Sequence, residues 1–122
     1  MFEQLAASGA PATPDSIAQL GGGWAAPDAL AVAVFCALSA ASVEEGLLAA
    51  VNHSGDSDAC GALCGQLLGT AHGVHAIPEG WRRRIELHRT VDAMADDLVA
   101  WFEHADRRPS GEAWAWARYP GW

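Results

Sequence analysis

The amino-acid sequence predicts an all-α fold, and three observations lead to this prediction. About half of the 122 residues are hydrophobic, but much of that share is alanine, and the chain has one tyrosine and three phenylalanines. Several segments open with residues that begin helices, and apolar side chains then recur at helical spacing. The run LAVAVF at residues 30–35 resembles a strand, but Pro27 before it and the alanine-rich sequence after it favour a helix.

The length and charge of the chain narrow the class of protein. The length suits one domain with a single core but not two ordinary domains. The net charge is -8 and all seven cations are arginines, which argues against nucleic acid as a partner. The longest apolar window, residues 29–41, is shorter than the roughly 20 residues that cross a bilayer. The start of the chain has an acidic residue and no basic segment before an apolar run, so we expect a cytoplasmic protein without a membrane partner.

The first helices are predicted from their starting residues. Residues 1–12 are small and polar and contain proline, so we expect a flexible leader. Thr13 followed by Pro14 is typical of an N-cap and first helical residue, and the short helix that follows should stop at Gly21–Gly23. Pro27 opens a second helix that is apolar on all sides, which predicts a central buried helix.

The third and fourth helices carry a cap signal and a glycine row. Ser42 with Glu45 forms a capping-box pattern before the third helix, whose apolar residues include Leu47, Leu48 and Val51. The fourth helix should run from about Ser57 to Gly73, with glycine at every fourth position from Gly61. Each interior glycine costs about 1 kcal/mol relative to alanine, so the row predicts close approach of another helix.

The last predicted helix is amphipathic and precedes an aromatic tail. Apolar residues from Val91 to Phe102 follow helical spacing, and the helix should end near His104. We expect residues 13–105 to form one helical domain. Residues 106–122 form a Trp-rich tail, whose aromatic side chains should pack on the helices rather than bind a ligand.

Three cysteines form an odd set. Cys60 and Cys64 share one helical face, and Cys36 lies in the predicted central helix. Without a second matched pair, they are more typical of reduced, buried side chains than of a metal or redox pair.

Asp56 and Asp58 are the candidate site residues, at the turn before the fourth helix. An aspartate there often accepts hydrogen bonds from the first turn of the helix, and this capping role is one interpretation. The other is a cation site. Two aspartates two residues apart within a helix point about 200° apart, so they share an ion only if Asp56 lies in the turn, a bend that Gly55 allows.

An ordered series of motifs supports the cation interpretation. The segment VNHSGDSDACGALCGQLLGTAHGVHAIPEGW, at residues 51–81, resembles the Asn-x-x-Gly-Asp-[Ser/Thr]-Asp signature of the ADP-ribosylglycohydrolase family, with its glycine-rich helix and later Ile-Pro-x-x-Trp. Upstream, LGGGWAAPDALAVAVFCAL is similar to the segment that precedes that signature. The resemblance covers roughly residues 20 to 105.

The resemblance implies an all-α orthogonal helical bundle of the ADP-ribosylglycohydrolase type, here incomplete. It also implies a binuclear Mg²⁺ centre, sometimes Mn²⁺, with Asp56 and Asp58 as metal ligands. The implied reaction is metal-dependent hydrolysis of the glycosidic bond between ADP-ribose and a modified target. The implied partners are an ADP-ribosylated protein or an ADP-ribose derivative. No catalytic or substrate-binding residue is assigned.

Two departures from the family pattern define an alternative. Ala59 stands where the family usually has a Ser or Thr that supplies a hydroxyl ligand. The family's Thr-Asp-Asp motif has no equivalent, because Glu44 and Glu45 suit a solvated first turn and Asp96 and Asp97 suit the surface. The alternative is therefore a non-catalytic helical remnant or interaction module. We expect the chain alone not to hydrolyse ADP-ribosyl bonds, and a missing amino-terminal half is a further expected partner.

Overall fold

The computed structural model describes residues 1–102 and 116–120. Regular structure in these ranges is entirely helical, which confirms the all-α prediction. The chain divides into two compact units, Met1–Arg82 and Arg83–Trp122. Each unit is described by itself.

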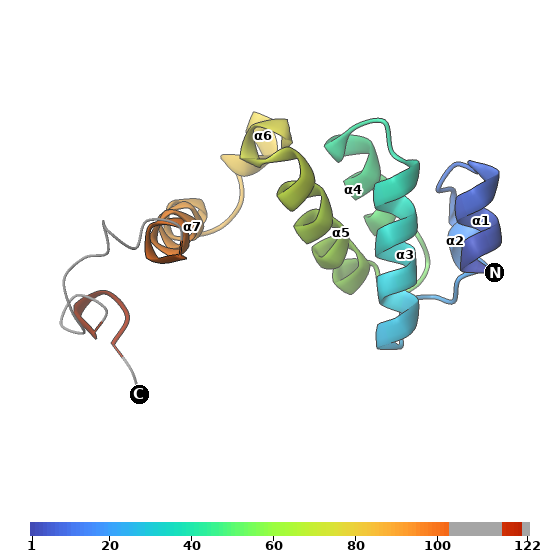
Figure 1. Cartoon of the computed structure of the whole chain (residues 1–122), viewed down its shortest axis with the longest axis horizontal. Helices are drawn as coiled ribbons and strands as arrows, with labels where there is room; N and C mark the ends of the chain where they lie inside the picture. Colours follow the sequence, from blue (N-terminus) through green and yellow to red (C-terminus); the bar gives the residue numbers. More distant parts are fainter. Residues whose placement is uncertain (103–115, 121–122) are drawn as a thin grey trace. The chain divides into compact units, whose positions relative to one another are not determined.

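The first unit contains most of the helices (Figure 1). They are α1 (Phe2–Ser8), α2 (Pro14–Ala18), α3 (Ala26–Ser39), α4 (Val43–Val51), α5 (Ser57–His72), the 3₁₀ turn η1 (Val74–Ala76) and α6 (Glu79–Arg82). Helix α1 occupies part of the segment expected to be a flexible leader, and its Phe2 and Leu5 pack against the core. That segment therefore carries regular structure, whereas the predicted domain limits stay predictions.

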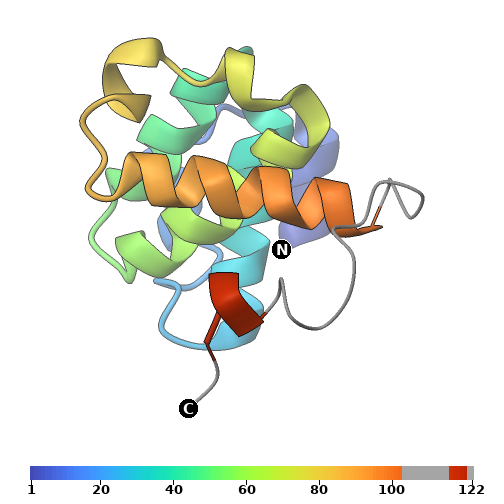
Figure 2. The same ribbon diagram turned by 90° about the vertical axis from the view of Figure 1, so that its left-hand side faces the viewer.

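The core of the first unit lies among α3, α4 and α5, which remain grouped in both views (Figures 1 and 2). Its completely buried side chains include Val32 and Phe35 of α3, Ala50 of α4 and Cys60 of α5. The sequence predicts that α3 is buried on all sides, and this is wrong for one face, since Leu38 is 69% exposed. Alanine on the remaining faces allows the neighbouring helices to approach.

The predicted cap residues begin their helices. The Thr13 hydroxyl accepts a hydrogen bond from the Ser16 amide, and the Ser16 hydroxyl accepts one from the Thr13 amide, so the box is closed by serine. The Ser42 hydroxyl accepts from the Glu45 amide at 3.1 Å. The Glu45 carboxylate accepts a hydrogen bond from the Ala41 amide. In a regular capping box it would accept from the amide of the N-cap residue, Ser42, which is one residue later. These local bonds fix the ends of α2 and α4.

The glycine row on α5 faces α4 only in its first half. A Cβ at Gly61 would lie 2.5 Å from Val51 Cγ1, and one at Gly65 would lie 3.4 Å from Leu47 Cδ2. A Cβ at Gly69 would meet nothing within 4 Å. The prediction of close helix approach is therefore confirmed at Gly61 and Gly65 but not at Gly69.

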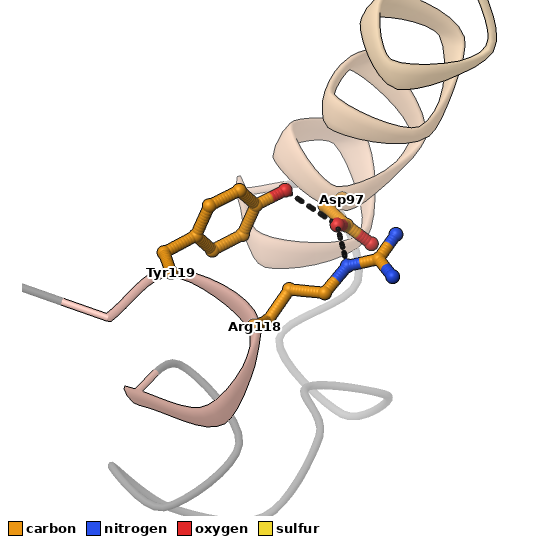
Figure 3. A network of polar contacts seen from close by, with 3 residues as sticks. All are labelled: Asp97, Arg118 and Tyr119. Carbon is orange, nitrogen blue, oxygen red and sulfur yellow. Dashed lines mark hydrogen bonds and ion pairs between the residues drawn. The ribbon is translucent and has the colours of Figure 1, made fainter.

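The second unit contains α7 (His88–Phe102), and residues 116–118 form a further helical turn. Asp97 of α7 accepts hydrogen bonds from Arg118 Nε at 2.9 Å and from the Tyr119 hydroxyl at 2.5 Å (Figure 3). Leu87, just before α7, has a positive φ of 57°. The predicted helix end near His104 and Trp114 of the tail lie outside the described residues. Trp116 of the tail is 61% exposed, so the prediction that the tail aromatics pack on the helices is wrong for this residue. No helix in the part of the chain that the structure describes is long and apolar enough to span a bilayer.

Candidate metal-binding turn at the start of α5

The turn between α4 and α5 is held by its own backbone amides. The Gly55 amide donates to His53 Nδ1 at 3.1 Å, and the Ser57 amide donates to the Gly55 carbonyl at 2.9 Å. Between them, the Asp56 amide donates to the carbonyl of Gly22 at 2.6 Å. Three consecutive amides therefore have acceptors, and one acceptor lies 34 residues earlier in the sequence.

The two aspartates lie at the corner that the sequence predicts. Asp56 is the N-cap residue of α5, with φ -73° and ψ 72°, so it lies in the turn and not in the helix. Its carboxyl makes no capping hydrogen bond. Asp58 lies in the first turn of α5, and its Oδ1 accepts a hydrogen bond from the Ala59 amide at 2.9 Å. Asp58 raises the pKa of the Asp56 carboxyl, but the Ala59 amide nevertheless lowers it, so Asp56 interacts with the first turn of α5 as well as with Asp58.

The two carboxyl groups lie close enough to shift each other's pKa. A hydrogen bond to Asp58 raises the pKa of the Asp56 carboxyl, and the same hydrogen bond lowers the pKa of the Asp58 carboxyl. Two carboxylates this close repel each other unless a proton or a cation lies between them. The geometry brings the two predicted site residues together.

The donor set fits part of a site for a hard cation. Mg²⁺ and Mn²⁺ prefer carboxylate, carbonyl and water oxygens, and two adjacent carboxylates supply such oxygens. Within residues 1–102 and 116–120, no three His, Cys, Asp or Glu side chains gather as a metal would require. The turn therefore offers two ligands of a site, and any others would have to come from elsewhere.

The neighbours of the turn show what sequence reasoning missed. The sequence predicts Gly21–Gly23 only as the stop of a helix, but Gly22 and Gly23 pack against Gly55 and Asp56. The three adjacent glycines were the available signal, because such a run allows backbone to approach backbone closely. His53 acts as a local hydrogen-bond acceptor through Nδ1, and its Nε2 is buried with no partner among the described residues.

The cysteines are buried thiols that do not take part in this chemistry as ligands. Cys36, Cys60 and Cys64 are free and buried, as predicted. Burial raises the pKa of Cys36 to about 12 and that of Cys64 to about 11. They are protonated thiols at neutral pH and therefore poor metal ligands and nucleophiles.

The motif Ile77, Pro78, Trp81 follows α5. Ile77 and Pro78 line a pocket of about 620 Å³ together with Ser42 and Glu44 at the start of α4. Asp56 and Asp58 are not among its lining residues.

Comparison with known proteins gives a family match and partial relatives. The family model described as ADP-ribosylglycohydrolase matches residues 2–108. The chain is 43% identical over 54 residues to the ADP-ribosyl-[dinitrogen reductase] glycohydrolase of Rhodospirillum rubrum, covering 39% of this chain and 18% of the relative. It is 24% identical over 98 residues to the ADP-ribosylhydrolase ARH3 of Bos taurus and of Homo sapiens, covering 71% of this chain and 27% of each relative. No solved structure gives a significant match.

The match with the family model extends further toward both ends than the motifs quoted above. The chain spans between 18% and 27% of the length of these curated relatives.

Proposed function

The chain belongs to the ADP-ribosylglycohydrolase family, and on that premise we propose that it carries the Asp56 and Asp58 ligands of a Mg²⁺ or Mn²⁺ centre. The reaction of the complete centre is hydrolysis of the glycosidic bond between ADP-ribose and a modified target. The relatives whose names include ADP-ribosyl glycohydrolase and ADP-ribosylhydrolase support this class of substrate.

The observation that carries the proposal is the placement of Asp56 in the turn beside Asp58, where the two carboxyl groups shift each other's pKa in opposite directions. A pair of aspartates that served only to cap α5 would direct their oxygens to the amides of its first turn. The larger effect on the pKa of Asp56 comes from Asp58 and raises that pKa, whereas the Ala59 amide lowers it, so the pairing of the two carboxyl groups outweighs capping at this residue. The arrangement costs electrostatic repulsion at neutral pH, which a divalent cation between the oxygens would reverse.

The residues of this chain would hold and orient the metal, while the bound ion would supply a polarised water to the anomeric carbon. Asp56 offers its carboxyl from the turn, and Asp58, whose Oδ1 accepts from the Ala59 amide, offers its carboxyl beside it. The positive end of the α5 dipole disfavours a cation, so two negative charges at this position also offset that field.

A non-catalytic role within the same family is the second candidate. It is favoured by Ala59, whose side chain has no oxygen to offer, and by the grouping of only two acidic ligands in the described residues. In this role the packing of α3, α4 and α5 is kept while the metal is not bound.

A Mn²⁺ titration of the 122-residue chain, by calorimetry or by electron paramagnetic resonance, separates the two candidates. We expect binding in the wild type and loss of binding in Asp56→Asn and in Asp58→Asn. Glu44→Gln is the matched control, because it removes one exposed carboxylate from the first turn of α4. Equal binding by all four proteins would contradict the metal role, and absence of binding in the wild type would favour the non-catalytic role.

Release of ADP-ribose tests the reaction itself. We expect no release by this chain alone, because two carboxylates cannot hold two Mg²⁺ ions. Activity that disappears in Asp56→Asn would contradict that expectation and would place a complete site in these residues.

A further inference from the structure

We propose that the loop Gly21–Gly23 is a positioning element for the carboxylate pair, and that its Gly22 carbonyl holds the backbone of Asp56 in the turn. The inference rests on the metal role proposed above and adds residues that lie more than thirty positions before the aspartates. It concerns the conformation of the turn rather than the ligands.

The central contact is between two stretches of backbone. The Asp56 amide donates to the Gly22 carbonyl at 2.6 Å, a short hydrogen bond for an amide. A Cβ at Gly55 would overlap the Gly22 carbonyl oxygen and would lie 2.5 Å from the Gly22 carbonyl carbon and 2.7 Å from its Cα. Only glycine at position 55 therefore lets the two backbones meet.

Gly23 closes the other side of the contact. Its φ of 78° is in the left-handed region, and a Cβ there would lie 2.5 Å from Cys60 Sγ and 3.4 Å from the Asp56 carbonyl oxygen. Cys60 is completely buried and its own amide donates to that carbonyl at 3.1 Å. The loop is thus fitted between the turn and the first turn of α5, where a side chain would push it away.

The consequence is a fixed direction for the Asp56 side chain. Asp56 has a turn conformation with ψ of 72°, and this backbone sets the point from which its side chain starts beside Asp58. The bond from its amide to Gly22 fixes one flank of that residue, and the bond from the Cys60 amide to its carbonyl fixes the other. Preorganised ligands bind a metal more tightly because less conformational freedom is lost on binding.

The first test measures the contact without any metal. Hydrogen exchange of the wild-type chain, followed by NMR, should show the Asp56 amide exchanging at least about tenfold more slowly than an unstructured amide. Exchange at the unstructured rate would overturn the proposal, and this measurement needs no variant to fold.

The second test separates positioning from stability. Gly55→Ala should reduce Mn²⁺ affinity by about 10- to 100-fold, the usual effect of losing support around a ligand. Gly46→Ala is the matched control, because a Cβ there would lie 2.7 Å from Leu68 Cδ1 and 3.1 Å from Ala40 Cβ, within the helix packing rather than at the turn. It should lower the thermal midpoint while leaving Mn²⁺ affinity unchanged. Circular dichroism at the titration temperature verifies that both variants are folded.

The outcomes distinguish this inference from the proposed function. If the wild type binds Mn²⁺ and Gly55→Ala binds equally well, the positioning role is wrong although the metal role survives. If Gly46→Ala loses as much affinity as Gly55→Ala, the effect is one of stability and the positioning role is again wrong. If the wild type binds no Mn²⁺, the proposed function fails, and the exchange rate of the Asp56 amide alone decides whether the loop holds the turn.

Discussion

Ala59 is the residue at which the site departs most clearly from the family pattern. It follows Asp58 directly, and its amide already donates to Asp58 Oδ1 at 2.9 Å. A hydroxyl on this residue would lie one residue after Asp58, in the first turn of α5. The departure is therefore small in space, although it removes one oxygen from the donor set.

Ala59→Ser should increase Mn²⁺ affinity. The gain should stay below about tenfold, or ~1.4 kcal/mol, because a neutral hydroxyl contributes less than a carboxylate and no other ligand is added. Calorimetric titration measures it. The double variant Ala59→Ser with Asp58→Asn should show no gain, and equal affinity in the wild type and Ala59→Ser would mean that the hydroxyl position is not at the metal.

At the scale of elements, the contact between α4 and α5 depends on which glycines face the neighbouring helix. Gly61 lies against Val51, whereas Gly69 lies about two turns later on α5 with open space beside it. The same substitution at these two positions therefore has opposite consequences, although the sequence places both in one row.

Gly61→Ala should lower the free energy of unfolding by about 1 to 3 kcal/mol through overpacking against Val51. Gly69→Ala should raise it by about 1 kcal/mol, because alanine favours the helix and meets no neighbour. Urea unfolding followed by circular dichroism gives both values. Adding Val51→Ala to Gly61→Ala should restore part of the loss, and similar effects of both single substitutions would contradict the packing described.

The Asp97, Arg118 and Tyr119 network ties the helical turn at residues 116–118 to α7 (Figure 3). The Tyr119 hydroxyl, and then Arg118, lower the pKa of Asp97, whereas the bond to Asp97 raises the pKa of Tyr119. A lowered carboxyl pKa stabilises the network above the unfolded value of about 4, and that contribution is lost as the pH falls through the folded value. A raised phenol pKa stabilises it below about 10, and that contribution is lost as the pH rises through the folded value.

The network should therefore be most populated between these limits. NMR shifts of the Tyr119 ring should be constant through the middle of the range and should move at both ends. Asp97→Asn serves as the control, since it removes the carboxylate and with it the change at low pH. A Tyr119 signal that shows the same acid transition in Asp97→Asn would contradict the network.

Local sequence signals explain which elements are predictable. Helix α2 begins at its N-cap Thr13, α4 begins at its N-cap Ser42, and α5 ends at Gly73. Each of these residues forms hydrogen bonds with backbone only a few positions away, so its role can be read from the local sequence. Helix α1 has no side-chain cap at its start and is held by packing on α3, so the only local signal in its sequence is Gly9, whose left-handed conformation ends it. The site divides in the same way. Gly55 made the meeting of the two aspartates predictable, whereas the contact with Gly22 joins distant segments and follows only from the fold.

At the scale of the molecule, each unit leaves large apolar side chains exposed. In the first unit Trp24 is 76% exposed and Leu38 is 69% exposed, and in the second unit Phe102 is 71% exposed. Among the described residues, these exposed side chains are larger than the alanines that are buried in the core. Apolar surface of this kind is typical of proteins that bind another surface or associate.

The isolated chain should therefore dimerise or bind a hydrophobic dye. Sedimentation velocity and dye fluorescence measure these properties. Leu38→Gln should weaken both without lowering the thermal midpoint, because the leucine is mostly outside the core. A compact monomer that binds no dye would contradict this prediction.

The three buried thiols allow the rate at which the core of the first unit opens to be measured. Cys36, Cys60 and Cys64 come from α3 and α5 and are completely enclosed, and burial raises the pKa of each of their thiols. An alkylating reagent reacts with thiolate in contact with solvent, so modification has to wait until the two helices separate. The mass of the protein during such labelling should pass from unmodified to triply modified with few intermediates. The rate of that change reports how often the centre of the first unit comes apart.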